Sequence, residues 1–264
     1  MPSVLIAGAS GYAGALAARL IDRHPTFELA AITSRGDAGR RLSELYPHHR
    51  VAMVLEELDL DRHAAADAAI VAYPHGASAP LVAALLERGV RVVDLSADFR
   101  LRDLATYERW YVSHAHPDLL ERAVYGLTEL HREEIAGADL VACPGCFPTA
   151  AILALAPLAQ AGLIADVVID AKTGVSGAGR GLREDTQFVA VAENVRPYGV
   201  GEHRHMPEID QELAALGAPV TAAFTPHLLP LDQGELLSCY VTPSRSVAGG
   251  EREALYASYY ADEP

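Results

Sequence analysis

The feature that most constrains the fold is a glycine-rich turn between the first apolar run and the first helical run. Residues 3–8 have the character of a buried strand, and residues 12–23 have the periodicity of an amphipathic helix. Small residues at such a turn let backbone N–H groups reach a pyrophosphate, and the helix N-terminus adds a favourable field. We expect a phosphate-binding loop here, and an ordinary tight turn is the alternative. The residues expected in this loop are Gly8, Ser10, Gly11, Tyr12, Ala13 and Gly14.

The first half of the chain continues this alternation of strand and helix. Strands that alternate with helices are typical of a parallel sheet with helices packed on it. We therefore predict an α/β fold that starts with a Rossmann-type parallel sheet domain over residues 1–145. The further runs that support it are strand-like at 28–33, 68–72, 91–94 and 139–143, and helical at 77–88.

The end of the second predicted strand indicates which dinucleotide would bind. This strand is followed by Ser34 and Arg35, where an NAD-binding domain has an acidic residue for the ribose 2′-hydroxyl. A hydroxyl and a guanidinium suit a 2′-phosphate instead. We predict NADP(H) as the cofactor, and a solvated surface arginine is the alternative for Arg35.

Two later turns follow predicted strands of the same sheet. The first contains Pro74 and His75, and the second contains Ser96, Asp98 and Arg100. Dinucleotides bind at the carboxyl ends of parallel strands, so we expect Pro74, His75 and Ser96 beside the cofactor. The alternatives are a loop histidine that caps nearby backbone and an ion pair between Asp98 and Arg100.

Cys146 stands between the strand-like run at 139–143 and a long Ala/Leu-rich run typical of a helix. A thiol at the first turn of a helix meets unpaired backbone N–H groups and the positive end of the helix dipole, which favour the thiolate. Cys146 is therefore a candidate nucleophile for attack on a carbonyl. The alternative is a small buried apolar residue, which is common for a free cysteine.

The second half supplies candidate groups for the chemistry. A strand-like run at 167–171 leads into a Gly/Ser-rich loop that ends at Arg180, which suits an anionic substrate, although a flexible connector has the same composition. His203 and His205 flank Arg204 just before a predicted helix. Histidine is the natural proton shuttle at neutral pH and would keep a thiolate at Cys146. The sequence leaves open which histidine does so.

Residues 146–264 are predicted to form a second, α+β domain. Apolar runs between residues 220 and 241 indicate two strands joined by a proline-bracketed loop. A mixed or antiparallel sheet with helices follows from these runs.

A zinc site made by Cys143, Cys146, His203 and His205 is a competing interpretation. Structural zinc sites normally separate their histidines by three to five residues, whereas this pair is H-x-H. We therefore expect no metal, and we expect no thioredoxin-like redox pair because the C-x-x-C follows a dinucleotide domain.

The composition excludes some classes of partner. The 264 residues include 21 basic and 35 acidic ones, which gives a net charge of −14 and argues against nucleic acid or an anionic membrane as a general partner. The start of the chain has no charged segment followed by a long apolar run, so we expect a cytoplasmic location. Three cysteines do not make a secreted disulfide framework.

Taken in order, the motifs resemble those of the N-acetyl-gamma-glutamyl-phosphate reductase family, within the aspartate-semialdehyde dehydrogenase superfamily. The motifs that carry the resemblance are Gly8–Gly14, Pro74–Gly76, Asp94–Arg100, Pro144–Thr149, Ser176–Arg180, His203–Ile209 and Thr225–Pro230.

The resemblance implies an NADPH-dependent reductase that acts on a small-molecule acyl phosphate in arginine biosynthesis. Cys146 would form a thioester, hydride transfer would release the semialdehyde, and His203 or His205 would manage protons. Ser176 and Gly177 would complete the cofactor site. Arg100, Arg180 and Arg204 would hold the anionic substrate, and a homo-oligomer, dimer or tetramer, is implied.

Two departures from the family pattern stand out. Position 143 is usually Asn and is Cys here. Family members also continue beyond residue 264, so we expect this chain to lack a C-terminal segment. The alternative functions are a related reductase of aspartyl phosphate or of carrier-linked aminoadipyl phosphate, and a non-catalytic NADP-binding sensor.

Overall fold

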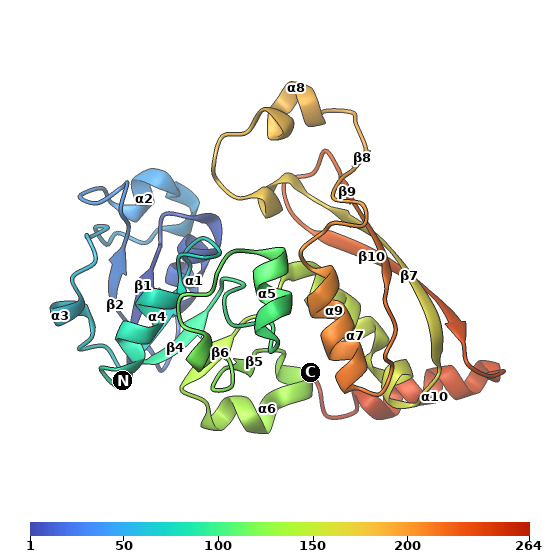
Figure 1. Cartoon of the computed structure of the whole chain (residues 1–264). Helices are drawn as coiled ribbons and strands as arrows, with labels where there is room; N and C mark the ends of the chain where they lie inside the picture. Colours follow the sequence, from blue (N-terminus) through green and yellow to red (C-terminus); the bar gives the residue numbers. More distant parts are fainter. The chain divides into compact units, whose positions relative to one another are not determined.

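The chain folds into two compact units, Met1–Pro144 and Gly145–Pro264, in a computed structural model that describes residues 1–264. Each unit is built on its own sheet, with six strands in the first and four in the second (Figure 1). The first sheet is parallel throughout and the second is mixed. The predicted fold class, a Rossmann-type parallel sheet followed by an α+β unit, is confirmed.

The first sheet reverses its strand order next to β1. Its strands lie in the order β2-β1-β3-β4-β6-β5, so the chain leaves β1 towards β2 on one side and returns to β3 on the other. In doubly wound sheets, ligands bind at the carboxyl ends of the strands where the order reverses. The strands are β1 (Ser3–Ala7), β2 (Glu28–Thr33), β3 (Ala68–Val71), β4 (Arg91–Asp94), β5 (Val124–Tyr125) and β6 (Leu140–Ala142).

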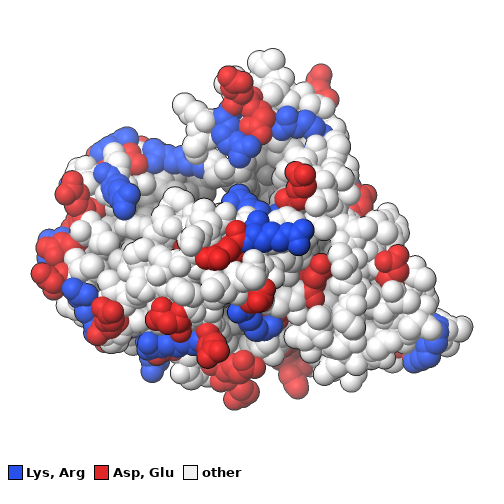
Figure 2. Space-filling model, in the orientation of Figure 1, with Lys and Arg blue, Asp and Glu red and all other residues white.

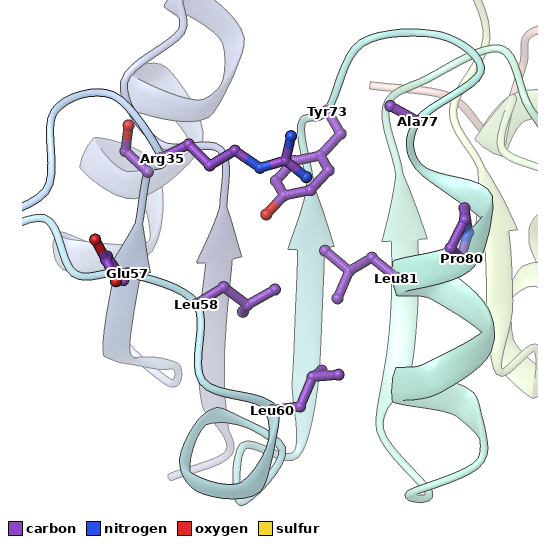
Figure 3. Close-up of a pocket in the computed structure, with 9 residues that line it drawn as sticks. Arg35, Glu57, Leu58, Leu60, Tyr73, Ala77, Pro80 and Leu81 are labelled. Atoms are coloured by element: carbon purple, nitrogen blue, oxygen red, sulfur yellow. The ribbon is translucent and has the colours of Figure 1, made fainter.

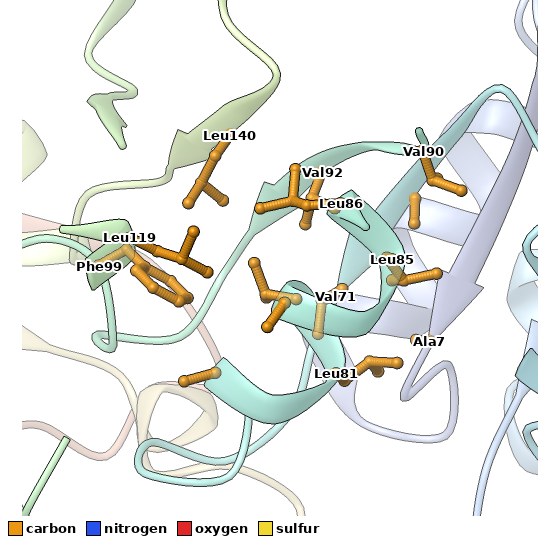
Figure 4. Close-up of a cluster of buried hydrophobic side chains, with 14 of the residues drawn as sticks. Ala7, Val71, Leu81, Leu85, Leu86, Val90, Val92, Phe99, Leu119 and Leu140 are labelled. Atoms are coloured by element: carbon orange, nitrogen blue, oxygen red, sulfur yellow. The ribbon is translucent and has the colours of Figure 1, made fainter. Parts of the chain in front are cut away.

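Helices cover both faces of this sheet, because alternate residues of its strands point to opposite sides. Val4 and Ile6 pack in a cluster with α1, whereas Leu5 and Ala7 pack in a cluster with α4 (Figure 4). The helices of this unit are α1 (Tyr12–Asp22), α2 (Leu42–Leu45), α3 (Leu60–His63), α4 (Ala79–Leu86), α5 (Leu104–Trp110) and α6 (Thr128–Gly137), with 3-10 turns at η1 (Pro47–His49) and η2 (Pro117–Leu119).

The second sheet has the order β10-β7-β9-β8, in which β7 and β9 are parallel and the edge strands run antiparallel to their neighbours. Its strands are β7 (Ile164–Thr173), β8 (Arg196–Pro197), β9 (Ala223–Leu228) and β10 (Glu235–Pro243). The helices are α7 (Cys146–Gln160), α8 (Phe188–Val191), α9 (Met206–Ala215) and α10 (Gly249–Tyr259), with 3-10 turns at η3 (Val175–Ala178) and η4 (Glu184–Thr186).

One face of this second sheet is buried under helices. Leu155 of α7 and Leu213 of α9 pack against Ile169 of β7 in a single apolar cluster. α10 is attached to α7 by two hydrogen bonds of 2.5 Å, which Tyr256 and Tyr260 donate to backbone carbonyls of α7.

The other face of the second sheet is open. Val168 of β7 is 43% exposed, and Leu236 and Tyr240 of β10 are 65% and 62% exposed. Tyr240 lies opposite Val168 in the register of the two strands, and Leu236 lies on the same face four residues before Tyr240, beyond the Ser238–Asp170 pair. Below, we call Val168, Leu236 and Tyr240 the open-face patch.

Both signs of charge occur on the surface. On the face drawn in Figure 2, Lys and Arg side chains are interspersed with Asp and Glu. No helix of the molecule combines the length and the apolar character that a membrane crossing requires.

Replacing a buried leucine tests the packing of the helix-covered core of the second unit. Leu155 is 1% exposed, and a Leu→Ala change at such a site costs about 2–5 kcal/mol because it removes apolar contacts and leaves a cavity. We expect Leu155→Ala to lower the denaturant midpoint of this unit accordingly. Leu20→Ala on α1, where the leucine is 61% exposed, is the control and should change it little. Equal effects of both substitutions would contradict the described packing.

Candidate active site

The turn between β1 and α1 is a close backbone crossing that only glycine allows at two of its positions. Gly8 has φ +88°, and a methyl group built there would lie 2.5 Å from the Ala72 carbonyl oxygen. A methyl group on Gly14 would lie 2.3 Å from the Gly8 carbonyl oxygen. At Gly11 the nearest atom is 3.7 Å away, so that position has room for a side chain. The loop thus brings the start of α1 and the end of β3 together around β1.

The structure also brings together the two serines that the sequence predicts at the cofactor site. The hydroxyls of Ser10 and Ser34 are hydrogen-bonded at 2.8 Å, and Ser34 Oγ accepts the Asp37 N–H at 3.3 Å. Tyr46 donates its hydroxyl to the Ser10 carbonyl at 2.7 Å. These contacts fix the end of β2 against the glycine-rich turn.

A pocket of about 720 Å³ lies beside Ser34 and Arg35 (Figure 3). The Arg35 side chain reaches across it so that its guanidinium lies beside the Tyr73 ring, and Leu58 and Leu81 give the pocket apolar walls. Burial raises the pKa of Tyr73, so its hydroxyl stays protonated. An apolar pocket with one guanidinium suits an adenosine that carries a phosphate. The lining residues are Ser34, Arg35, Glu57, Leu58, Leu60, Tyr73, Ala77, Pro80 and Leu81.

His75 and Ser96 have partners within the first unit. His75 Nδ1 accepts the Ala97 N–H at 2.9 Å, and the Ser96 hydroxyl donates to Asp94 at 2.6 Å. Burial raises the pKa of Asp94. The first of these hydrogen bonds joins the turns that follow β3 and β4, and the second lies within the turn after β4. The cofactor contacts predicted for Pro74, His75 and Ser96 stay predictions.

Arg100 is buried, and its guanidinium links two backbone segments by hydrogen bonds. Its Nε donates to the Cys143 carbonyl at 2.6 Å and its Nη2 donates to the Leu95 carbonyl at 2.8 Å. Sequence reasoning missed this role, because carbonyl partners 43 and five residues away give no local signal. The substrate contact predicted for Arg100 stays a prediction.

The two cysteines of the C-x-x-C differ in environment. Burial raises the pKa of Cys143 to about 11, so that residue is a protonated thiol at neutral pH. Cys146 is exposed. Of the two, Cys146 is therefore the accessible sulfur. No group of three or more His, Cys, Asp and Glu side chains is arranged to hold a metal ion.

Cys146 is the first residue of α7, at the helix start that the sequence predicts. The preceding residue, Gly145, is the N-cap, and its N–H donates to Glu208 Oε1 of α9 at 2.8 Å. Its carbonyl accepts the Thr149 N–H at 3.0 Å. Two helices of the second unit thus hold the thiol at a fixed position.

His203 is enclosed by aromatic rings. Its ring centroid lies 5.2 Å from that of Phe224, and 5.6 Å from those of Phe147 and Tyr198. Burial first, and the nearby Arg204 second, lower its pKa to about 4. His203 is therefore a neutral imidazole at physiological pH, and its Nδ1 accepts the His205 N–H at 3.2 Å.

His205 lies against the backbone beside the nucleophile. A methyl group built on Gly145 would lie 2.5 Å from His205 Nε2, so only glycine allows this approach. The structure therefore places one predicted histidine next to the residue that precedes Cys146. Which histidine handles protons stays open.

Sequence reasoning missed two groups that lie close to Cys146. Desolvation raises the pKa of Glu235, and interaction with the Cys146 thiol offsets part of that rise. Burial first, and then negative charge on Cys146 and Glu235, raise the pKa of Tyr198. Glu235 begins β10 and is 89 positions from Cys146, so only the topology of the sheet brings the two together.

Of the remaining predicted residues, Ser176, Gly177 and Arg180 follow β7, and Arg204 precedes α9. Ser176 and Gly177 belong to η3, where the Ser176 N–H donates to the Asp232 carbonyl at 2.9 Å. Arg180 and Arg204 are both exposed. Their predicted contacts with cofactor and substrate stay predictions.

Comparison with protein families matches both units. Residues 3–138 match the NAD binding domain of semialdehyde dehydrogenases, and residues 146–264 match their dimerisation domain.

Curated relatives match the chain over nearly its whole length. The chain is 50% identical to the N-acetyl-gamma-glutamyl-phosphate reductase of Desulforudis audaxviator, over 100% of the chain and 78% of that protein. It is 50% identical to the reductase of the same name from Syntrophobacter fumaroxidans, over 98% of this chain and 77% of that protein. It is 48% identical to the one from Halorhodospira halophila, over 100% of this chain and 78% of that protein.

Solved structures share the fold. Aspartate semialdehyde dehydrogenase II of Vibrio cholerae, complexed with ASA, aligns with a TM-score of 0.70 at 16% identity, over 97% of this chain and 78% of that one. The aspartate semialdehyde dehydrogenase of Candida albicans, solved with NADP, aligns with a TM-score of 0.63 at 16% identity, over 94% of this chain and 73% of that one. With identities near 50% along its length, the chain belongs to the N-acetyl-gamma-glutamyl-phosphate reductase family of semialdehyde dehydrogenases.

Proposed function

We propose that this protein catalyses the NADPH-dependent reductive dephosphorylation of N-acetyl-glutamyl 5-phosphate to N-acetyl-glutamate 5-semialdehyde, a step of arginine biosynthesis in the cytoplasm. The observation that carries the proposal is an exposed cysteine at the first residue of α7, in a chain about 50% identical to reductases of that name along its whole length. Residues 1–145 are the NADP-binding domain of this proposal, and residues 146–264 are the catalytic and dimerisation domain.

The chemistry follows from the groups around Cys146. The thiolate attacks the acyl carbon, phosphate leaves, and a thioester remains on the enzyme. Bound NADPH supplies the hydride that reduces the thioester to the aldehyde. His203 and His205 are the candidates for managing protons at the substrate carbonyl oxygen, and Arg180 and Arg204 for holding the anionic groups of the substrate.

The residues of the first unit fit NADP(H). The glycine-rich turn admits the close approach of a pyrophosphate, and Arg35 offers a guanidinium in the pocket beside Ser34. A guanidinium and a hydroxyl match a 2′-phosphate, which supports NADP(H) over NAD(H).

The open-face patch supports a homo-oligomer. The patch belongs to the unit that matches a dimerisation domain, and exposed apolar side chains that face water together favour burial against a partner. We place the subunit interface of a dimer on this sheet face.

Replacing Cys146 tests the reaction. Serine keeps the shape of the side chain but is a far weaker nucleophile at neutral pH. We expect Cys146→Ser to lower NADPH oxidation with N-acetyl-glutamyl phosphate by roughly 10⁴-fold or more, the scale seen when a catalytic nucleophile is removed. Cys239→Ser, in β10, is the matched control and should keep its activity. Turnover of aspartyl phosphate but not of the acetylglutamyl substrate, or an active Cys146→Ser enzyme, would contradict the proposal.

Replacing Arg35 tests the choice of cofactor. Loss of the guanidinium removes hydrogen bonds to a charged phosphate, worth about 1.5–3 kcal/mol, so we expect Arg35→Ala to raise the KM for NADPH roughly 10- to 100-fold. The KM for NADH, which has no 2′-phosphate, should stay the same. Arg91→Ala, at the amino end of β4, is the control. An unchanged KM for NADPH would show that Arg35 is a surface arginine.

Replacing Val168 tests the interface. An aspartate opposite Tyr240 in the open-face patch would bury an unpaired charge in the proposed dimer, so we expect Val168→Asp to be a monomer by light scattering. Leu20→Asp places the same charge on an exposed leucine of α1 and should leave the assembly unchanged. A dimeric Val168→Asp protein would move the interface elsewhere.

A further inference from the structure

We propose that Tyr46 is a positioning residue for NADP(H), which acts by fixing the peptide unit between Ser10 and Gly11 at the start of α1. This inference deepens the proposed function and rests on it. Tyr46 lies 36 positions from Ser10 and outside the motifs that the sequence analysis singled out, so only the fold connects it to the glycine-rich turn.

The contact is a hydrogen bond from a buried side chain. Tyr46 is 7% exposed, and its hydroxyl donates to the Ser10 carbonyl at 2.7 Å. Its ring packs in the apolar cluster that contains Ile6 of β1 and Ala15 of α1. The core of the first unit therefore fixes the phenol ring, and the hydroxyl at the end of the ring meets the turn.

The peptide unit between Ser10 and Gly11 is held on both sides. A peptide unit is planar, and its carbonyl and N–H point in opposite directions, so fixing both groups fixes its orientation. The carbonyl accepts from Tyr46, and the Gly11 N–H donates to the Gly8 carbonyl at 3.3 Å. Gly11 is the N-cap of α1, so this peptide unit sets where the helix begins.

The segment that carries Tyr46 also contacts α1 directly. His49 is buried, and its ring stacks on that of Tyr46 with the ring centroids 5.2 Å apart. Its Nδ1 lies 3.1 Å from the Ala15 carbonyl, which can only accept, so Nδ1 carries the proton. Burial first, and the neighbouring His48 second, lower the pKa of His49, which favours the neutral ring. Residues 46–49 therefore bind both the turn and the helix that follows it.

The orientation of this peptide unit bears on anion binding. The first N–H groups of a helix have no partner within the helix, and they are the donors that a pyrophosphate meets at a glycine-rich turn. A carbonyl oxygen carries partial negative charge, so a Ser10 carbonyl turned towards the phosphates would repel them. The Tyr46 hydroxyl stabilises the orientation in which this oxygen faces Tyr46 instead.

Tyr46→Phe tests this role, because it removes the hydroxyl and keeps the ring. Loss of one such hydrogen bond weakens the favoured orientation by roughly 2- to 10-fold, so we expect the Kd for NADPH to rise by that factor in a titration of NADPH fluorescence. The Kd for NADH should rise by the same factor, because both dinucleotides carry the pyrophosphate. Arg35→Ala is expected to weaken NADPH alone, so the two variants separate positioning of the turn from recognition of the 2′-phosphate.

Tyr256→Phe is the matched control. Its hydroxyl also donates to a backbone carbonyl, that of Ala154 in α7, so the same type of hydrogen bond is lost in the second unit. The Kd for both dinucleotides should stay the same in this variant. In Tyr46→Phe, kcat at saturating NADPH should equal that of wild type, which separates positioning of the cofactor from a general loss of structure.

The outcomes separate this role from the proposed reaction. An unchanged Kd for NADPH in Tyr46→Phe, or a rise in the Kd for NADPH but not for NADH, would overturn the role of Tyr46. A wild-type protein that binds NADPH but does not turn over the acetylglutamyl substrate contradicts the proposed function. The titration needs no acyl phosphate, so in that case the Kd comparison still decides whether Tyr46 positions the cofactor.

Discussion

The hydrogen bond from the Gly145 N–H to Glu208 fixes the part of the molecule on which the chemistry depends. Glu208 is almost fully buried in α9, and its carboxylate binds the N-cap of α7, where the helix dipole favours negative charge. The bond joins the two helices that cover the second sheet, and it sets where Cys146 begins α7. Because Gly145 carries no side chain, His205 can also approach this point.

The same bond changes how the helix N-terminus acts on the thiol. An isolated helix start favours a thiolate at its first residue. Here the buried Glu208 carboxyl already accepts the N–H of Gly145, the N-cap of α7. A carboxylate at that position offsets part of the positive field at the start of the helix.

Local patterns in the sequence predicted the elements that short stretches of chain determine. The glycine-rich turn, the strands of the parallel sheet and the position of Cys146 at a helix start all depend on neighbours within a few residues, and the structure has each of them. β5 and β8 escaped prediction because strands of two residues show no periodicity. The proximity of Glu235 to Cys146 escaped prediction because sheet topology brings β10 to α7, and no residue next to Glu235 signals it.

The two histidines show why residue type alone did not assign the proton acceptor. A His-Arg-His sequence reads as a basic cluster, but the fold encloses His203 among three aromatic rings and leaves it neutral. A buried neutral imidazole can donate a hydrogen bond from one ring nitrogen and accept one at the other. Burial thus acts on the histidine and on Glu235 in opposite directions, because it disfavours the charged form of each. The pKa of the imidazole falls and that of the carboxyl rises.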